Sequence, residues 1–277
     1  MKNMKRIKLL FPAIAGLVLA FGCQQQAPRN IVRLATTTSV RDTGLLDVLN
    51  ETFQKDGKHT LQAIAVGSGQ AMQLGRTGEA DLLWVHSPDD EKKFVEEGLG
   101  TDRITFLHND FVLLGPAADP AKVKGARKAA EAFKKIVSAK ALFVSRADQS
   151  GTHKKELKLW AAAGAQPAEE HYLEAGQGMA GTLSIAEEKK AYVLVDRSTY
   201  LSMKKTLGLE IVSEGDEALI NRYSLILIPT AKFSRVNAPG ARAYYDFVLS
   251  KQAKEIIEGF GVEKYGQQLF FYDYAAK

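Results

Sequence analysis

Residues 142–156 (LFVSRADQSGTHKKE) place one arginine and several small hydroxyl donors between an apolar run and an amphipathic run. The segment therefore joins a predicted strand to a predicted helix, which is where ligands bind in open α/β sheets. Arg146 could clamp an oxyanion, with Asp148 as its carboxylate partner. Further hydroxyl and backbone N–H donors would come from the next three small residues, Ser150, Gly151 and Thr152. The alternative is an ordinary helix start that Ser150 or Asp148 caps, with Arg146 in solvent.

The same segment raises a hydrolytic alternative, with Ser150 as nucleophile and His153 as base. The histidine lies only three residues on in the same helix, and the pattern supplies no third residue to orient it. The pattern therefore favours a binding site, and we predict that the chain is not an enzyme.

Two more predicted strand-to-helix junctions are rich in small donors. The segment ATTTSVRDTG (35–44) carries four consecutive hydroxyl residues, Thr36, Thr37, Thr38 and Ser39. Asp42 or Thr43 would be enough to cap the following helix, so the hydroxyl run is available for a ligand. The segment VGSGQAM (66–72) sets Ser68 between two glycines, which expose backbone N–H groups, and the absence of a following lysine argues against a nucleotide P-loop.

A fourth glycine-rich helix start, EAGQGMAGT (174–182), precedes a strand that ends in VDRSTY (195–200). Both segments could reach a ligand. A structural ion pair between Arg197 and Asp196 explains the second one equally well.

The elements that would position these junctions alternate between strand and helix patterns from residue 31 onward. Such alternation predicts an α/β fold with parallel sheets covered by helices on both faces. No long linker interrupts the pattern, so two lobes would have to be joined by strands, and we expect DFVLLGP (110–116) and YSLILIP (223–229) to cross between them.

The N-terminal residues form a separate unit. Residues 1–22 combine a basic start with a 14-residue apolar run, which is too short to span a membrane and is typical of a signal peptide. Cys23, the only cysteine, follows a glycine at the end of this run, as in a lipoprotein cleavage site where the cysteine is lipidated. Cleavage nearby that leaves a free thiol is the alternative. Residues 23–30 would then form a polar tether.

Charge and composition exclude several classes of protein. Without residues 1–22 the chain has 33 Lys and Arg against 32 Asp and Glu, so the sequence pI of 9.1 does not indicate a nucleic-acid or membrane partner. The five histidines show no metal-ligand spacing, and a single cysteine excludes a disulfide framework. We therefore expect no metal cation site and no cofactor.

Taken together, these segments resemble a known family. TTTSVRDTGLLDVL, AVGSGQAMQLG, GEADLLWVHSPDDEKKFVEEG, NDFVLLGP, FVSRADQSGTHKKEL, GQGM and LVDRSTYL occur in this order, as in the tungstate-binding component of bacterial ABC importers. The resemblance extends from about residue 31 to FGVEKYGQQLF near the C-terminus. Family sequences often read Arg-Gly-Asp-Asp-Ser-Gly-Thr-His, whereas Ala147 and Gln149 replace the glycine and the second aspartate here.

The resemblance implies a periplasmic-binding-protein fold of the second type, with two Rossmann-like lobes and a cleft that closes on the ligand. One lobe would comprise residues 31–110 and 225–277, and the other residues 111–224. It also implies a tungstate ligand, with molybdate as the close competitor, delivery to the permease and ATPase subunits of an importer, and a periplasmic or cell-surface location. The implied ligand-binding residues are Thr37, Thr38, Ser39, Ser68, Arg146, Ser150, Gly151 and Thr152.

Two alternatives remain at this point. Phosphate-binding relatives use a similar Arg-x-Asp-x-Ser-Gly-Thr segment, but monohydrogen phosphate carries a proton that needs a carboxylate acceptor, for which Asp42 or Asp148 could serve. Tungstate is a fully deprotonated dianion at neutral pH and needs donors only. A cell-surface adhesive or signalling lipoprotein would bind no anion tightly.

Overall fold

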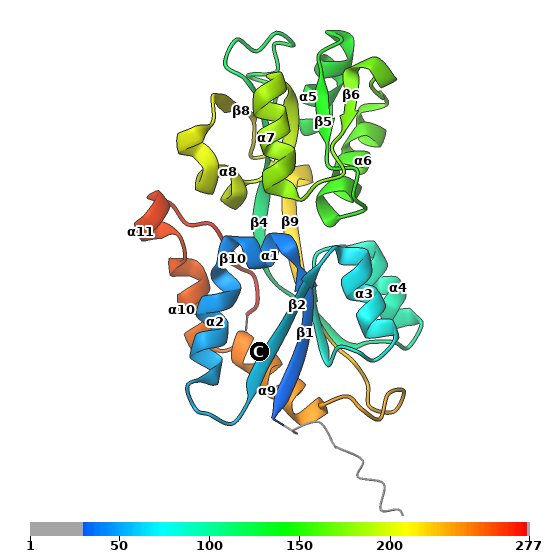
Figure 1. The fold of residues 1–277 in the computed structure, drawn as a ribbon, viewed down its shortest axis with the longest axis vertical. Helices are drawn as coiled ribbons and strands as arrows, with labels where there is room; N and C mark the ends of the chain where they lie inside the picture. Colours follow the sequence, from blue (N-terminus) through cyan, green and yellow to red (C-terminus); the bar gives the residue numbers. More distant parts are fainter. Residues whose placement is uncertain (1–29, 276–277) are drawn as a thin grey trace, which may run out of the picture.

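The structure, a computed structural model, describes residues 30–275. The predicted signal peptide, Cys23 and nearly all of the predicted tether lie outside these residues. Two α/β lobes are stacked along the long axis and are joined by β4 (Thr101–Pro116) and β9 (Ile220–Leu227) (Figure 1). We call the half that contains the described N-terminus lobe 1 and the other half lobe 2.

Lobe 1 is built on three parallel strands that β9 and the first part of β4 extend. The strands are β1 (Ile31–Thr37), β2 (Thr60–Val66) and β3 (Leu82–Val85), in the order β2-β1-β3-β9-β4, and β10 (Phe271–Tyr272) pairs with β4. Its helices are α1 (Thr38–Thr43), α2 (Leu45–Gln54), α3 (Ser68–Arg76), α4 (Pro88–Glu96), α9 (Ala238–Val248), α10 (Lys251–Gly259) and α11 (Val262–Tyr265).

Lobe 2 repeats this plan around a second group of parallel strands. The strands are β5 (Phe143–Ser145), β6 (Tyr172–Glu174) and β7 (Tyr192–Asp196), and β8 (Leu209–Ser213) runs antiparallel to β4. The α-helices are α5 (Ala129–Ser138), α6 (Gly151–Ala163), α7 (Met179–Lys189) and α8 (Arg197–Met203), and short 3-10 helices cover Glu169–His171, Lys204–Thr206 and Glu217–Leu219.

Each lobe has apolar cores on both faces of its sheet, as the α/β prediction requires. In lobe 1, α2, α9 and α10 pack on one face and α3 and α4 on the other. In lobe 2, Phe111 and Leu113 of β4 face α5 and α6, whereas Val112 and Leu114 face α7 and α8. This alternation follows from the two-residue period of a strand. The predicted fold class is confirmed.

The crossing strands differ from the sequence prediction in length and direction. β4 begins at Thr101, nine residues before the predicted strand, and pairs antiparallel with β9 up to Asp110 and with β7 and β8 from Phe111. The two crossing strands are antiparallel because the chain leaves lobe 1 on β4 and returns on β9. The ladder between them starts at Asp110 and Ile220, so β9 pairs only with strands of lobe 1 and the return crossing is made where the chain enters β9 at Ile220. The predicted residue boundaries of the lobes stay a prediction.

Within residues 30–275, every helix is too short or too polar to cross a membrane. In the same part of the chain, we find no group of three or more His, Cys, Asp or Glu side chains that could hold a metal ion.

Candidate functional site

Three parallel strands of lobe 1 end at one edge of the sheet, and each leads into a helix. Thr37 ends β1, Thr38 begins α1, and Ser68 begins α3. Thr37 and Ser68 are buried, at 3% and 1% exposure. Ser39 lies in α1, but its side chain is outside what the structure describes. The predicted first-lobe donors therefore share one edge of the sheet, because parallel strands place their carboxyl ends side by side.

The lobe 2 part of the site is the turn between β5 and α6. Ala147 and Gln149 adopt left-handed backbone conformations, with φ of 50° and 60°, so that the chain folds back tightly before the helix begins at Gly151. Arg146, Ser150 and Thr152 are all buried. The predicted second-lobe donors thus lie within a single compact turn.

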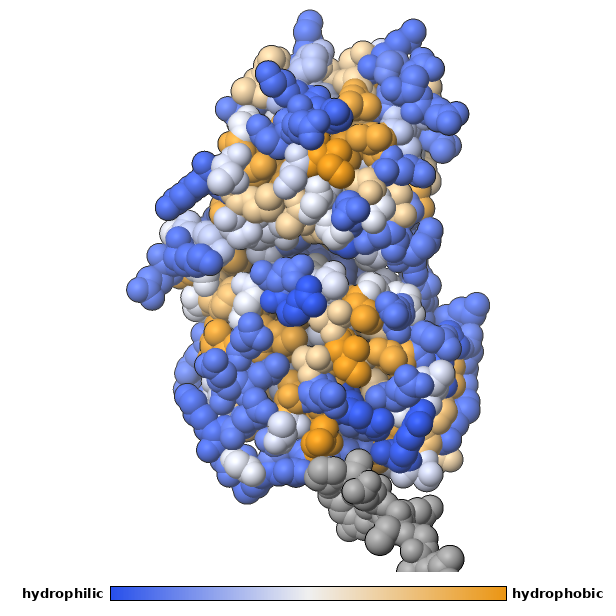
Figure 2. Space-filling view, in the orientation of Figure 1, coloured by the Kyte–Doolittle hydropathy of each residue, from blue (hydrophilic) through white to orange (hydrophobic). Residues whose placement is uncertain are grey.

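The two sheet edges meet between the lobes, where the molecular surface is recessed (Figure 2). Gly151 of lobe 2 lies directly against the imidazole ring of His86, which follows β3 in lobe 1. Two ion pairs join α6 to α4 beside this contact: Lys154 Nζ lies 2.5 Å from Asp90 Oδ2, and Lys158 Nζ lies 2.5 Å from Asp89 Oδ2. The lobes are therefore in direct contact beside the predicted donors.

Buried polar atoms without a hydrogen-bond partner concentrate at these junctions. Of six such side-chain atoms among the described residues, three are Arg146 Nε, Ser68 Oγ and Ser87 Oγ. A buried polar group left unpaired costs about 1–3 kcal/mol, so such groups require an explanation. Arg146 and Ser68 come from different lobes, and both were predicted to bind the ligand. An oxyanion bound between the lobes would accept hydrogen bonds from both.

Arg146 is held in place by Asp148. Its Nη2 lies 2.5 Å from Asp148 Oδ2, and Asp148 Oδ1 accepts a hydrogen bond from the Ser150 backbone N–H at 3.1 Å. The alternative that put Arg146 in solvent is wrong, since the side chain is only 4% exposed. The capping alternative is correct for Ser150, whose Oγ accepts the His153 backbone N–H at 3.2 Å. The Ser150 hydroxyl can still donate its own proton.

The hydrolytic alternative has no support in this geometry. Nδ1 of His153 accepts a hydrogen bond from the backbone N–H of Gln149 at 3.2 Å, and therefore has no proton to give and no lone pair left for Ser150. Nδ1 of His153 thus stabilises the turn through the Gln149 N–H.

Two other sequence candidates have structural roles. Thr36 Oγ1 donates to the Trp84 carbonyl at 2.9 Å, which ties β1 to β3. Arg197 does not pair with Asp196: it binds Asp110 at 2.8 and 2.6 Å and Glu214 at 2.6 Å, while Asp196 caps α8. These hydrogen bonds raise the pKa of the Arg197 guanidinium and brace β4 where it crosses into lobe 2.

His86 and the polar residues behind it were not among the predicted site residues. His86 Nδ1 lies 2.8 Å from Asn221 Oδ1, and Asn221 Nδ2 donates to Asn109 Oδ1 and to the Tyr223 hydroxyl, each at 2.8 Å. Burial lowers the pKa of His86 to about 4, and the nearby charge of Arg146 contributes in the same direction. His86 is therefore neutral at physiological pH. Its position at the end of a buried strand was the available sequence signal.

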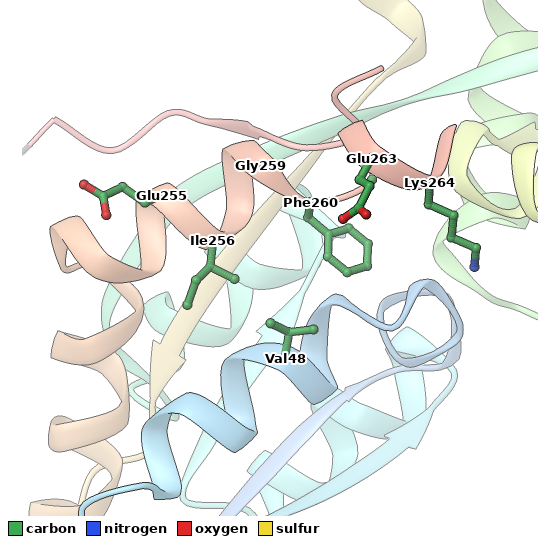
Figure 3. A pocket seen from close by; sticks show the side chains of 8 residues that line it. Val48, Glu255, Ile256, Gly259, Phe260, Glu263 and Lys264 are labelled. Atoms are coloured by element: carbon green, nitrogen blue, oxygen red, sulfur yellow. The ribbon is translucent and has the colours of Figure 1, made fainter. Parts of the chain in front are cut away.

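A surface hollow of about 630 Å³ lies elsewhere in lobe 1, between α2 and the α10–α11 region (Figure 3). Its lining combines apolar side chains such as Val48, Ile256 and Phe260 with the charged Glu255, Glu263 and Lys264. None of the predicted donors contributes to it, so it is separate from the candidate site.

Comparison with known proteins agrees with this architecture. The PBP superfamily domain matches residues 24–252. The tungstate-binding protein TupA of Peptoclostridium acidaminophilum is 45% identical over 96% of this chain and 98% of its own length.

Two solved structures are similar along most of the chain. The tungstate ABC transporter protein of Geobacter sulfurreducens is 42% identical with a TM-score of 0.75, over 82% of this chain and 97% of its own. The tungstate-binding protein TupA of Desulfovibrio alaskensis G20 is 40% identical with a TM-score of 0.78, over 88% of this chain and 99% of its own. The chain therefore belongs to the PBP superfamily and, within it, to the family of the TupA proteins.

Proposed function

We propose that this protein captures tungstate outside the cytoplasm and delivers it to an ABC importer, and that it is a binding protein and not an enzyme. The observation that carries the proposal is the pair of buried, unpartnered donor atoms, Ser68 Oγ and Arg146 Nε, one from each lobe. Relatives that are named for tungstate binding share 40–45% of the sequence over most of the chain.

The donors assigned to the ligand match a fully deprotonated anion. Four come from lobe 1 and four from lobe 2: Thr37, Thr38, Ser39 and Ser68, and Arg146, Ser150, Gly151 and Thr152. Arg146 supplies the single full positive charge, and the start of α6 adds backbone N–H groups with a favourable dipole. A charge-assisted hydrogen bond is roughly twice as strong as a neutral one, so Arg146 should dominate affinity.

Phosphate fits this donor set less well. Monohydrogen phosphate would need an acceptor for its proton, and both oxygens of Asp148 are already engaged by Arg146 and by the Ser150 N–H. The other candidate acceptor, Asp42, is 44% exposed at its side chain and pairs with Arg41. Asp148 is thus committed to Arg146 and the turn, whereas Asp42 is a surface carboxylate that binds Arg41 through Oδ1. Neither is a buried carboxylate reserved for a phosphate proton, which supports tungstate over phosphate.

The test is a ligand screen on the mature protein by calorimetry and thermal denaturation. Tungstate and molybdate should bind and raise the melting temperature, because a ligand that binds only the folded state stabilises it by mass action. Sulfate and phosphate should have little effect. Equal shifts for phosphate and tungstate at matched concentration would overturn the assignment in favour of phosphate.

We further propose a periplasmic or cell-surface location with lipid anchoring at Cys23 after removal of residues 1–22. The support is the sequence pattern alone, since these residues lie outside the described part of the chain. Replacing Cys23 with Ser should move the protein from the membrane fraction to the soluble fraction. A wild-type mature protein that is already soluble and begins at another residue would contradict the anchor.

A further inference from the structure

Glu156 lies beneath the turn that carries Arg146. It is the sixth residue of α6 and is only 1% exposed. Its Oε2 accepts a hydrogen bond from Ser145 Oγ at 2.8 Å, and the same Ser145 oxygen accepts the Ala147 backbone N–H at 3.2 Å. Ser145 and Ala147 flank Arg146 in the chain. Glu156 is therefore connected to both sides of the proposed oxyanion clamp through one serine hydroxyl.

The carboxyl group of Glu156 is buried among neutral donors. Its Oε1 accepts hydrogen bonds from the Tyr172 hydroxyl at 2.6 Å and from Trp160 Nε1 at 3.2 Å. From Asn30 to Ala275, no ion pair involves Glu156. A buried carboxylate is costly unless an opposite charge compensates for it, so this group is poised to take up a proton.

The charged groups around Glu156 do not compensate for its charge. The nearest cations on its own helix are used elsewhere, since Lys155 Nζ donates to the carbonyls of Ala218 and Ile220 and Lys158 pairs with Asp89. β6 contributes a second carboxylate, Glu174, and the Tyr172 hydroxyl, whereas β5 contributes only Ser145. Two further cations nearby are already paired: Arg146 with Asp148, and Lys154 with Asp90. The remaining neighbours are His153 in the first turn of α6 and the rings of Phe133 and Phe143, which pack on Trp160.

We propose that Glu156 is a positioning residue that couples oxyanion binding at the Arg146 turn to the uptake of one proton. The inference rests on the proposed function. A bound dianion adds negative charge near a buried carboxylate, and like charges favour the neutral form of the carboxyl group. When Glu156 takes a proton from solvent, its hydroxyl donates to Ser145 Oγ, which still accepts the Ala147 N–H. The Ser145 hydrogen then turns from Glu156 to the neighbouring Tyr172 oxygen. The hydrogen-bond link from Glu156 to the turn is kept while the opposing charge is removed.

The titration range suits such a coupling. Burial raises the pKa of Glu156 to about 7, opposed by the hydrogen bonds from Tyr172, Ser145 and Trp160 and reinforced by Glu174. If bound tungstate raises this pKa by about one unit, uptake reaches about half a proton per anion near pH 7.5. Because protonation and binding then favour each other, affinity should be about tenfold tighter at pH 6 than at pH 9.

The experiment is titration with tungstate at pH 6 to 9, by calorimetry in Pipes, Hepes and Tris, whose ionisation enthalpies differ. The wild-type protein should show proton uptake and the tenfold pH dependence. Glu156→Gln keeps the shape and hydrogen-bonding capacity but cannot titrate, so both effects should disappear while binding persists. Glu188→Gln is the matched control: it removes the same charge from an exposed position in lobe 2 and should behave as wild type.

Tyr172→Phe gives a second measurement that does not depend on the folding of Glu156→Gln. It removes a donor that stabilises the carboxylate, so the pH midpoint of the affinity change should move upward. Tungstate binding without proton uptake, or uptake that persists in Glu156→Gln, would overturn the coupling and leave the proposed function intact. A wild-type protein that fails to bind tungstate at any of these pH values would overturn the proposed function itself.

Discussion

The α-carbon of Gly151 in lobe 2 packs so closely against His86 in lobe 1 that a Cβ atom built on it would lie 2.3 Å from Cε1 of the imidazole ring. The backbone of Gly151 is not in the left-handed region, so the glycine is needed for space and not for its conformation. The contact joins the lobes beside Arg146, whose charge acts on His86. It therefore provides a way to disturb closure of the lobes without altering any proposed ligand side chain.

Replacing Gly151 with alanine should weaken tungstate binding and leave lobe 2 folded. The added methyl group must push His86 away, and overpacking of this kind costs about 1–3 kcal/mol, or about 5- to 150-fold in affinity. Stability without ligand should fall by less than the binding energy, because the lobes can part to relieve the clash and alanine favours the helix. Calorimetry and thermal denaturation measure both effects. Gly259→Ala, at a helical glycine with open space around it, is the control. Unchanged affinity in Gly151→Ala would show that the lobes bind ligand without this contact.

Arg146→Ala removes the one full positive charge among the proposed donors. A buried charged partner is worth about 2–5 kcal/mol when truncated, so affinity should fall from about thirtyfold to a few thousandfold. Arg146→Lys should recover only part of it, because an ammonium group cannot reproduce the planar guanidinium. The exposed Arg222, which pairs with Glu217, offers a matched control in Arg222→Ala. Equal calorimetric affinities in the wild type and all three variants would show that the turn is only a capped helix start and does not bind the ligand.

The ion pairs between α6 and α4 should make binding sensitive to salt. Each pair is partly exposed and is worth about 0.2–1 kcal/mol, so Lys154→Glu with Lys158→Glu should weaken affinity severalfold at low ionic strength. Adding Asp89→Lys and Asp90→Lys restores opposite charges and should restore affinity. Titrations at about 0.05 and 0.5 M salt compare the variants, and the differences should vanish at high salt. If the variant with all four substitutions fails to recover affinity, the ion pairs do not hold the lobes together.

His86 should lower the stability of the protein in acid. Burial holds its folded-state pKa at about 4, below the ordinary 6.5, so the unfolded chain binds more protons between these values. Stability is therefore lost as pH falls from 6.5 to 4, by up to about 3 kcal/mol. His86→Gln keeps an amide beside Asn221 and cannot titrate, so its stability relative to wild type should improve over the same range. Denaturant unfolding at pH 4 to 7 checks this, and a constant difference between the two proteins would contradict it.

The strand-to-helix junctions were predictable because each has a local signal. The apolar run before Arg146 predicts β5, and Gly164 predicts the end of α6, where it takes a left-handed φ of 57°. Hydroxyl residues in excess of the single cap residue pointed to ligand contact. His86 and Ser87 also lie between a strand and a helix, but a lone histidine after a strand is a weaker signal of ligand contact than a run of hydroxyl groups.

Other features depend on residues far apart in the sequence. The first half of β4 carries Asp102, Arg103, His108 and Asn109, so it lacks the apolar run that marks a strand, and pairing with β9 and β10 forms it instead. The contact of Gly151 with His86 requires both lobes to be placed. The burial of Glu156 depends on Tyr172 and Trp160 covering it, although its spacing from Ser145 was visible in the sequence.

The pairing of Asp110 with Ile220 has a consequence for how this chain is assembled. The residues at which the chain leaves and re-enters lobe 1 are ladder partners on adjacent strands, so everything between them is an insertion whose two ends are neighbours. A tight hairpin could in principle replace the whole insertion without stretching lobe 1, and the excised segment would have adjacent ends that permit it to be closed or permuted. Lobe 2 can thus be exchanged as a unit for another lobe with closely spaced ends. Such an exchange would change the ligand donors of lobe 2 while lobe 1 keeps its sequence, in natural evolution and in protein engineering alike.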